Sequence, residues 1–218
     1  MGRKRLTRAE RAARTRRLLM QAASKVCAKH GLERASIDEV AEEAGFTKGA
    51  FYANFRSKEE LFLAMLDERF SEQLAKLDAR MAGEGELSDQ ARDAAVDFAR
   101  DLSDDPVWMR LYFQFAAHAA RDEGFRAELV TRMRALRSRF AEIFRRRGER
   151  LPFPAPVEPD ELALMADVIV DGFAIHKLLD PDDFPDELHG RIWEVFVTGL
   201  RTMAVEQAEA VHEVRQVH

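Results

Sequence analysis

Cationic and hydrogen-bonding side chains concentrate at the start of the chain. Residues 1–58 hold 14 Lys and Arg against 6 Asp and Glu, whereas the remainder holds 20 against 33, within a net charge of −5. Eight of the basic residues lie between positions 3 and 17, Arg3 and Arg5 among them. A basic segment on an acidic chain is typical of a protein that binds a polyanion with one part only. These arginines would contact phosphates or a minor groove, although a solvated tail would have the same composition.

Residues 36–61, SIDEVAEEAGFTKGAFYANFRSKEEL, predict the elements that would position such side chains. Ser36 and Glu39 form a Ser-x-x-Glu capping box, which marks a helix start. Gly45 follows the last apolar position of that helix, where a left-handed stop residue belongs. Thr47 then predicts the cap of a second helix. Two short helices joined by a tight turn indicate a helix-turn-helix, whose second helix enters the major groove of DNA.

The second helix, expected over about 48–55, has one apolar and one polar face. Helical spacing turns Phe51 and Phe55 inward and leaves Lys48, Tyr52 and Asn54 facing outward. Lys48 lies in the first turn, where residues that enter the groove usually lie, and an asparagine can bond adenine through both amide atoms. Tyr52 could instead be a core aromatic residue.

Two serines at helix starts also enter this interpretation. Ser57 and Glu60 form a further capping box and predict a long helix that begins at Lys58. Ser36 could offer its hydroxyl and its helix N-terminus to a phosphate, although capping alone explains a serine there.

The stretch AGFTKGAFYANFRSKEEL resembles the signature of the tetracycline-repressor (TetR) family of transcription regulators, over roughly residues 12–66. The matching residues are Gly31, Ile37, Val40, Ala41, Ala44, Gly45, Lys48, Gly49, Phe51, Tyr52, Phe55, Lys58 and Leu61. The resemblance implies that Thr47, Lys48, Gly49, Tyr52 and Lys58 lie on the DNA surface. It further implies that Tyr52 and Lys58 bind phosphates, while Lys48 and Asn54 approach bases or adjacent phosphates. Asn54 departs from the family's usual His or Tyr, which leaves the operator sequence open.

Helical periodicity continues to the end of the chain, so we predict an all-α fold of about nine helices. Residues 1–57 would form a three-helix helix-turn-helix DNA-binding domain, and residues 58–218 a helical ligand-binding and dimerisation domain. The first five expected helices cover about 8–29, 37–44, 48–55, 58–81 and 88–102, the fifth with a cap at Ser88. The sixth begins at residue 106 and ends at a break at Asp122 or Gly124, and the seventh runs from that break to about 147. The last two cover about 160–179 and 185–210.

The last two expected helices favour a homodimer. Residues 160–179 are apolar on nearly all sides, and such a helix must be buried on nearly all sides. As in the family, both helices would pair with their symmetry mates in a four-helix interface, although the first could be the core helix of a monomer. The proposed interface residues are Val168, Ile169, Ile192, Phe196 and Leu200. Two copies would read a palindromic double-stranded DNA operator, with half-sites about one helical turn apart or a multiple of it.

Aromatic residues of the larger domain suggest a cavity for a small apolar or amphipathic effector. The candidate ligand-binding residues are Trp108, Tyr112, Phe115, His118, Phe173 and His176, although aromatic stripes are also ordinary core. The favoured function is a repressor that this effector releases from DNA. A ligand-independent or activating regulator, a sequence-neutral packaging protein and an enzyme with a site in the same cavity are the alternatives.

Other classes of protein find little support. The chain has no GxSxG, HExxH, phosphate-binding glycine loop or CxxC, so we expect no enzyme and no cofactor. Asp167, Asp171 and His176 are poorly spaced for a metal ion, so none is expected. Cys27 alone cannot form an intrachain disulfide, and the most apolar window, 162–179, carries charges that disfavour a membrane span. Cytoplasmic localisation is therefore expected.

Overall fold

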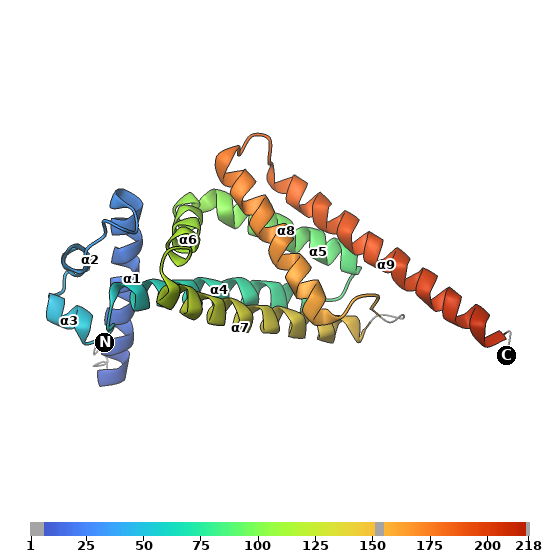
Figure 1. Ribbon diagram of the computed structural model, residues 1–218, viewed down its shortest axis with the longest axis horizontal. Helices are drawn as coiled ribbons and strands as arrows, with labels where there is room; N and C mark the ends of the chain where they lie inside the picture. Colours follow the sequence, from blue (N-terminus) through green and yellow to red (C-terminus); the bar gives the residue numbers. More distant parts are fainter. Residues whose placement is uncertain (1–6, 151–154, 217–218) are drawn as a thin grey trace, which may run out of the picture. The chain divides into compact units, whose positions relative to one another are not determined.

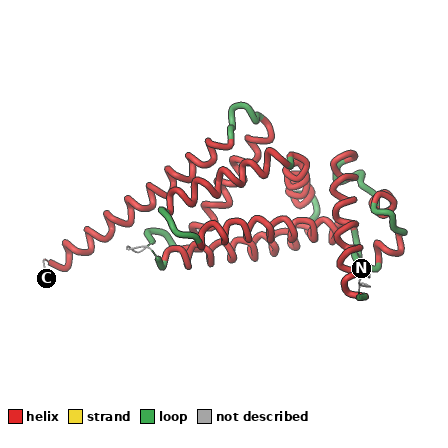
Figure 2. The backbone as a smooth tube through the Cα atoms, turned by 180° about the vertical axis from the view of Figure 1, so that it is seen from behind, coloured by secondary structure: helices red, strands yellow, loops and turns green. Residues whose placement is uncertain are grey.

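The computed structural model describes residues 7–150 and 155–216, with side chains described up to residue 210, and all its regular elements are helices (Figures 1 and 2). They are α1 (Arg8–His30), α2 (Ile37–Glu43), α3 (Lys48–Tyr52), α4 (Lys58–Ala82), α5 (Leu87–Asp104), α6 (Pro106–Ala119), α7 (Glu123–Gly148), α8 (Pro159–Leu179) and α9 (Asp186–Gln216). Over this part of the chain, the prediction of an all-α fold with about nine helices is confirmed. No helix within it is long and apolar enough to cross a membrane.

The helix bounds differ from expectation at α3, α5 and α9. The helix α9 runs six residues further than expected, and α3 is three residues shorter. The expected cap at Ser88 is wrong, because α5 begins at Leu87 and Ser88 lies inside it. Side chains from α5 and α7 instead bind the carbonyls of the turn between α4 and α5. Gln90 Nε2 donates to the Gly83 carbonyl at 2.9 Å, and Arg147 Nη2 donates to the Gly85 carbonyl at 3.0 Å.

The chain forms two compact units, each made of two segments. Unit one comprises the chain up to Arg69 together with Val107–Val130, and unit two comprises Phe70–Pro106 together with the chain from Thr131 onward. The helices α4 and α7 each contribute residues to both units. The predicted domain boundary at 57/58 therefore lies inside unit one.

An aromatic core holds unit one together. Phe51, Phe55, Phe62 and Phe115 are all less than 2% exposed. The rings of Phe62 on α4 and Phe115 on α6 lie 5.6 Å apart. Short helices such as α2 and α3 are marginal alone, so this shared core is what stabilises them.

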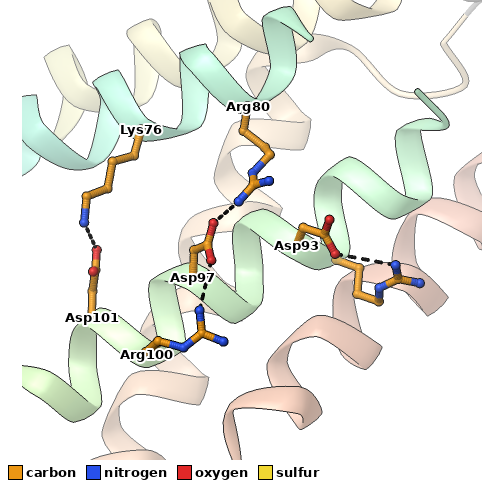
Figure 3. A network of polar contacts seen from close by, with 7 residues as sticks. Lys76, Arg80, Asp93, Asp97, Arg100 and Asp101 are labelled. Carbon is orange, nitrogen blue, oxygen red and sulfur yellow. Dashed lines mark hydrogen bonds and ion pairs between the residues drawn. The ribbon is translucent and has the colours of Figure 1, made fainter. Parts of the chain in front are cut away.

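In unit two, α5 packs closely against α9 and also contacts α8. The approach is tightest at Gly190, where a Cβ would come within 2.6 Å of Val96 Cγ2. Figure 3 shows an ion-pair ladder between α4 and α5, in which Lys76 faces Asp101 and Arg80 faces Asp97. Beyond these contacts, the C-terminal part of α9 projects past α5 and α8 in both views (Figures 1 and 2).

Candidate nucleic-acid interface

Local capping forms the helix-turn-helix as the sequence predicted. The Ser36 hydroxyl accepts the Glu39 N–H at 3.2 Å, and the Glu39 carboxylate accepts the Ser36 N–H at 3.0 Å. The Ser36 hydroxyl and the Ser36 backbone N–H both donate to the Glu39 carboxylate and hold the pKa of Glu39 below its usual value. The Thr47 hydroxyl caps α3 by accepting the Ala50 N–H at 3.2 Å. Gly45 adopts φ +72°, the left-handed conformation expected at the turn. Figure 1 shows α1, α2 and α3 side by side.

The helix α3 ends early because Asn54 bonds back to it. Asn54 Nδ2 donates to the Ala50 carbonyl at 2.8 Å, which takes the place of the backbone N–H that a continued helix would offer. The backbone N–H of Asn54 turns to the Phe51 carbonyl instead. The Asn54 side chain is therefore half-buried, not turned outward as expected. A contact between Asn54 and a base stays a prediction.

Lys48 is exposed but already has a partner. Its Nζ donates to Asp38 Oδ2 on α2 at 2.9 Å, and both side chains are more than half exposed. This hydrogen bond and the charge of Asp38 raise the pKa of Lys48. Sequence reasoning did not single out Asp38, and no local signal could have, because it lies ten residues away on another helix. A phosphate or base that bound Lys48 would have to compete with Asp38.

Two further residues of α3 face solvent. Tyr52 is 51% exposed, and its ring rests edge-on against Phe51 with the centroids 5.6 Å apart. Tyr52 is therefore a surface residue supported from beneath, and the alternative of a core aromatic is excluded. Gly49 is exposed, and a Cβ there would meet only Thr47 Oγ1 at 3.7 Å, an ordinary contact.

The remaining residues proposed to bind DNA have mixed environments. Lys58 Nζ donates to the Leu32 and Glu33 carbonyls at 3.3 and 3.2 Å, so it braces the α1–α2 turn. The Ser36 hydroxyl is engaged with Glu39. Of the predicted Ser57–Glu60 box only half forms, because the Glu60 carboxylate accepts the Arg56 N–H at 2.7 Å. Arg3 and Arg5 lie outside the described residues.

The candidate ligand-binding residues divide between the two units. In unit one, Trp108 and Phe115 are buried with centroids 6.4 Å apart, and His118 lies edge-on to Phe125 at 4.8 Å. Tyr112 is half-buried beside Phe113. Trp108 and Phe115 are therefore core residues, whereas Tyr112 and His118 are partly exposed at its edge, and a role in ligand binding stays a prediction for all four.

The other two candidates belong to unit two. Phe173 is buried and stacks on His189 at 4.3 Å, whereas His176 is exposed and stacks on Phe184 at 4.9 Å. Asp167, which entered the metal hypothesis, instead accepts Arg137 Nε at 2.7 Å. Burial raises the pKa of the Cys27 thiol to about 11, so at neutral pH this cysteine lacks the thiolate that a redox switch needs.

Apolar side chains on α8 and α9 are left uncovered. On α8, Val168 is 73% exposed and lies on one helical stripe with Leu164, Ile175 and Leu179. On α9, Val195 and Met203 are exposed, while Ile192, Phe196 and Leu200 are half-buried. Ile169 is also half-buried. Apolar area on this scale is typical of a surface that binds another protein.

Comparisons with known proteins agree with this arrangement. A family model described as bacterial regulatory proteins of the tetR family matches residues 19–65, and one described as the C-terminal part of BetI-type transcriptional repressors matches residues 88–204. The transcriptional repressor AcnR of Corynebacterium efficiens is 25% identical over 162 residues, which cover 73% of this chain and 79% of AcnR.

Solved structures show the same fold. The regulator FadR of Bacillus subtilis, solved in complex with stearoyl-CoA, superimposes with a TM-score of 0.67 at 12% identity, over 82% of this chain and 95% of FadR. A transcriptional regulator of Saccharomonospora viridis, solved with choline, gives a TM-score of 0.61 at 18% identity, over 85% and 96% of the two chains. With both family models matched and the helix-turn-helix intact, the chain belongs to the tetR family of bacterial regulatory proteins and is a DNA-binding transcriptional regulator, not an enzyme.

Proposed function

We propose that the protein is a homodimeric repressor that a small apolar or amphipathic molecule releases from a palindromic operator. Residues 1–57 would read DNA through α3, and residues 58–218 would bind the effector and form the dimer. The observation that carries the DNA-binding part is the surface of α3, where Lys48, Gly49 and Tyr52 are exposed together on a helix capped and braced from behind. AcnR and the BetI-type proteins are named as repressors, which supports repression here.

Two glycines support a second copy of the chain as the partner of α8 and α9. Gly172 lies on the α8 stripe between Val168 and Ile175, and Gly199 lies between Val195 and Met203 on α9. A Cβ at either glycine would meet nothing within 4 Å. A glycine inside a helix costs about 1 kcal/mol relative to alanine, and no contact among the described residues of one copy requires a glycine at either position. Close approach of a partner helix at these two points would explain both residues.

The effector class is supported by relatives and by composition. One structural neighbour was solved with a fatty acyl thioester and another with a quaternary ammonium compound. Both are small molecules with a polar group joined to apolar atoms. The candidates for contact with such a molecule are Trp108, Tyr112, Phe115 and His118 in unit one and, separately, Phe173 and His176 in unit two.

The effector hypothesis has a thermodynamic test. Ligands that raise the melting temperature would first be found in a panel of acyl thioesters and quaternary amines. The best ligand would then be titrated with and without operator DNA. Coupling is reciprocal, so operator must weaken ligand binding by the factor by which ligand weakens operator binding. Equal affinities in the two titrations would leave a ligand-independent regulator.

Lys48 and Asp38 should affect operator binding in opposite directions. We expect Lys48→Ala to weaken binding roughly 10-fold or more, because it removes a cation from the groove-facing turn. Asp38→Asn should strengthen binding about 2- to 5-fold, because it frees Lys48 from an exposed and therefore weak ion pair. Fluorescence anisotropy with operator DNA measures both, and melting temperatures serve as the folding control. Weaker binding by Asp38→Asn would show that Asp38 positions Lys48 and does not compete for it.

Gly49→Ala separates DNA binding from folding. The protein can accept the methyl group, since its nearest neighbour would be 3.7 Å away, and alanine favours the helix by about 1 kcal/mol. The melting temperature should therefore stay the same or rise, while operator affinity falls at least 10-fold as the methyl group meets the DNA. Unchanged affinity would mean that the backbone at Gly49 does not approach the duplex.

A further inference from the structure

Arg16 differs from the other arginines of α1. Arg8, Arg11, Arg14 and Arg17 are all exposed, whereas Arg16 is half-buried. Its Nη1 donates to the backbone carbonyl of Asn54 at 2.8 Å, across 38 residues of sequence. Its guanidinium carbon lies 4.1 Å from the centroid of the Phe55 ring. One side chain therefore combines a charge-assisted hydrogen bond with a cation–π contact at the end of the recognition helix.

The contacts of Arg16 continue to the exposed surface of α3. Phe55 lies 5.7 Å from Phe51, and Phe51 supports Tyr52 edge-on at 5.6 Å. On the backbone side, the carbonyl that Arg16 binds belongs to Asn54, whose amide holds the Ala50 carbonyl. Arg16 thus braces the last turn of α3 through its backbone and through its aromatic residues. Asn54 lies two residues past the end of α3, so removing Arg16 takes away the charge-assisted bond that ties the chain there to α1.

We infer that Arg16 is a positioning residue for operator recognition: it fixes the C-terminal end of α3 against α1, and so sets where Tyr52 and Lys48 meet DNA, without binding DNA itself. This inference deepens the proposed function and rests on α3 as the reading helix. It separates Arg16 from its exposed neighbour Arg17, whose side chain is free to reach a phosphate.

The two roles have different salt signatures. A side chain that neutralises a phosphate adds about 0.9 to the slope of log affinity against log salt, because it releases counterions. A residue that only positions α3 changes affinity and leaves that slope unchanged. Lysine keeps the charge but has neither the planar stacking surface nor the fork of arginine. Arg16→Lys should therefore restore a phosphate contact but not the brace.

The experiment compares Arg16→Met, Arg16→Lys and the matched control Arg17→Met in the full-length protein. Operator affinity is measured from 50 to 300 mM KCl, and the protein carries ¹⁹F-tyrosine. The chain has only two tyrosines, Tyr52 and Tyr112, so Tyr52→Phe assigns the spectrum. We expect both Arg16 variants to bind 10- to 100-fold more weakly with an unchanged salt slope and a shifted Tyr52 resonance. Arg17→Met should lower the slope by about one and leave the resonance in place.

Two results would overturn the inference. One is a salt slope reduced by about one in Arg16→Met and restored in Arg16→Lys, which would make Arg16 a phosphate contact. The other is unchanged affinity with an unmoved Tyr52 resonance. If Arg16→Met does not fold, Arg16→Gln, which keeps an N–H donor for the Asn54 carbonyl, takes its place. Failure of the proposed function can be told apart from failure of this inference. In the first case wild-type protein would show no preferred DNA site, while the Tyr52 resonance of the DNA-free protein would still show whether Arg16 positions α3.

Discussion

Val168→Arg should convert the protein from a dimer into a monomer and remove nearly all operator binding. Val168 lies on the exposed α8 stripe and is 73% exposed, so an arginine there should hardly destabilise a single copy of the chain. In a two-fold dimer the substitution buries two like charges at one interface, each without a partner. In a dimer, binding of the first recognition helix holds the second near its half-site at an effective concentration in the millimolar range. A monomer lacks this second contact, so its affinity for the operator should fall roughly 10²- to 10⁴-fold.

Light scattering at micromolar concentration and anisotropy with operator DNA test this prediction. The variant should give a mass near 24.9 kDa, and wild type should give twice that mass. Ala135→Arg is the control, because Ala135 lies on an exposed face of α7 with Ser138 and Glu142. A dimeric Val168→Arg variant would move the interface away from α8, and a monomeric wild type would refute the dimer.

The second large effect concerns pH and the buried side chain of His189. His189 is 1% exposed between α5, α8 and α9, and its ring stacks on Phe173. Its Nε2 accepts the Trp193 indole N–H at 3.1 Å, so the proton lies on Nδ1, which donates to the Ala95 carbonyl at 2.9 Å. Burial lowers the pKa of His189 to about 4 from an ordinary value of 6.5.

The sign of the pH effect follows from these two values. Between pH 6.5 and 4 the unfolded chain binds a proton at His189 that the folded protein does not, so the free energy of unfolding falls as pH falls through this window. The full loss is about 3 kcal/mol. Stability due to this group is fully present above pH 6.5.

His189→Asn should remove this pH dependence. The asparagine amide keeps a donor for the Ala95 carbonyl, but it loses the ring contacts and the acceptor for Trp193, at a cost of about 2–4 kcal/mol at pH 7. Urea denaturation at several pH values from 4.5 to 7.5 measures the free energy of unfolding. The slope of this free energy against pH should be shallower in the variant than in wild type, by the equivalent of up to one bound proton. His176→Asn, at an exposed histidine, is the matched control. An unchanged slope in His189→Asn would mean that His189 has the same pKa in the folded and unfolded protein.

Capping chemistry was the most reliable part of the sequence. The box at Ser36, the Thr47 cap and the left-handed Gly45 are all formed. These interactions join residues three or four positions apart, so the sequence contains both partners. Helical spacing likewise placed Phe51 and Phe55 inside and Tyr52 outside, because a helix sets the direction of each side chain relative to its neighbours.

Spacing could not predict partners on other helices. Arg16 and Arg17 are adjacent and chemically identical, yet only Arg16 meets the end of α3, and Asn54 was expected to face DNA although its amide bonds Ala50. Lys48 was expected to face outward and does so, but only the folding of α2 against α3 brings Asp38 to it. His189, which no sequence motif marks, gains its low pKa only from the three helices around it.

The sequence by itself therefore determined the family, the all-helical class and the cap of each reading helix, because these depend on residues within one or two helical turns. Only the tertiary structure decided which cations brace the recognition helix and which remain exposed, and which apolar faces α8 and α9 leave uncovered. The reason is geometric: spacing decides on which face of its own helix a side chain lies, whereas the packing of distant segments decides what that face meets.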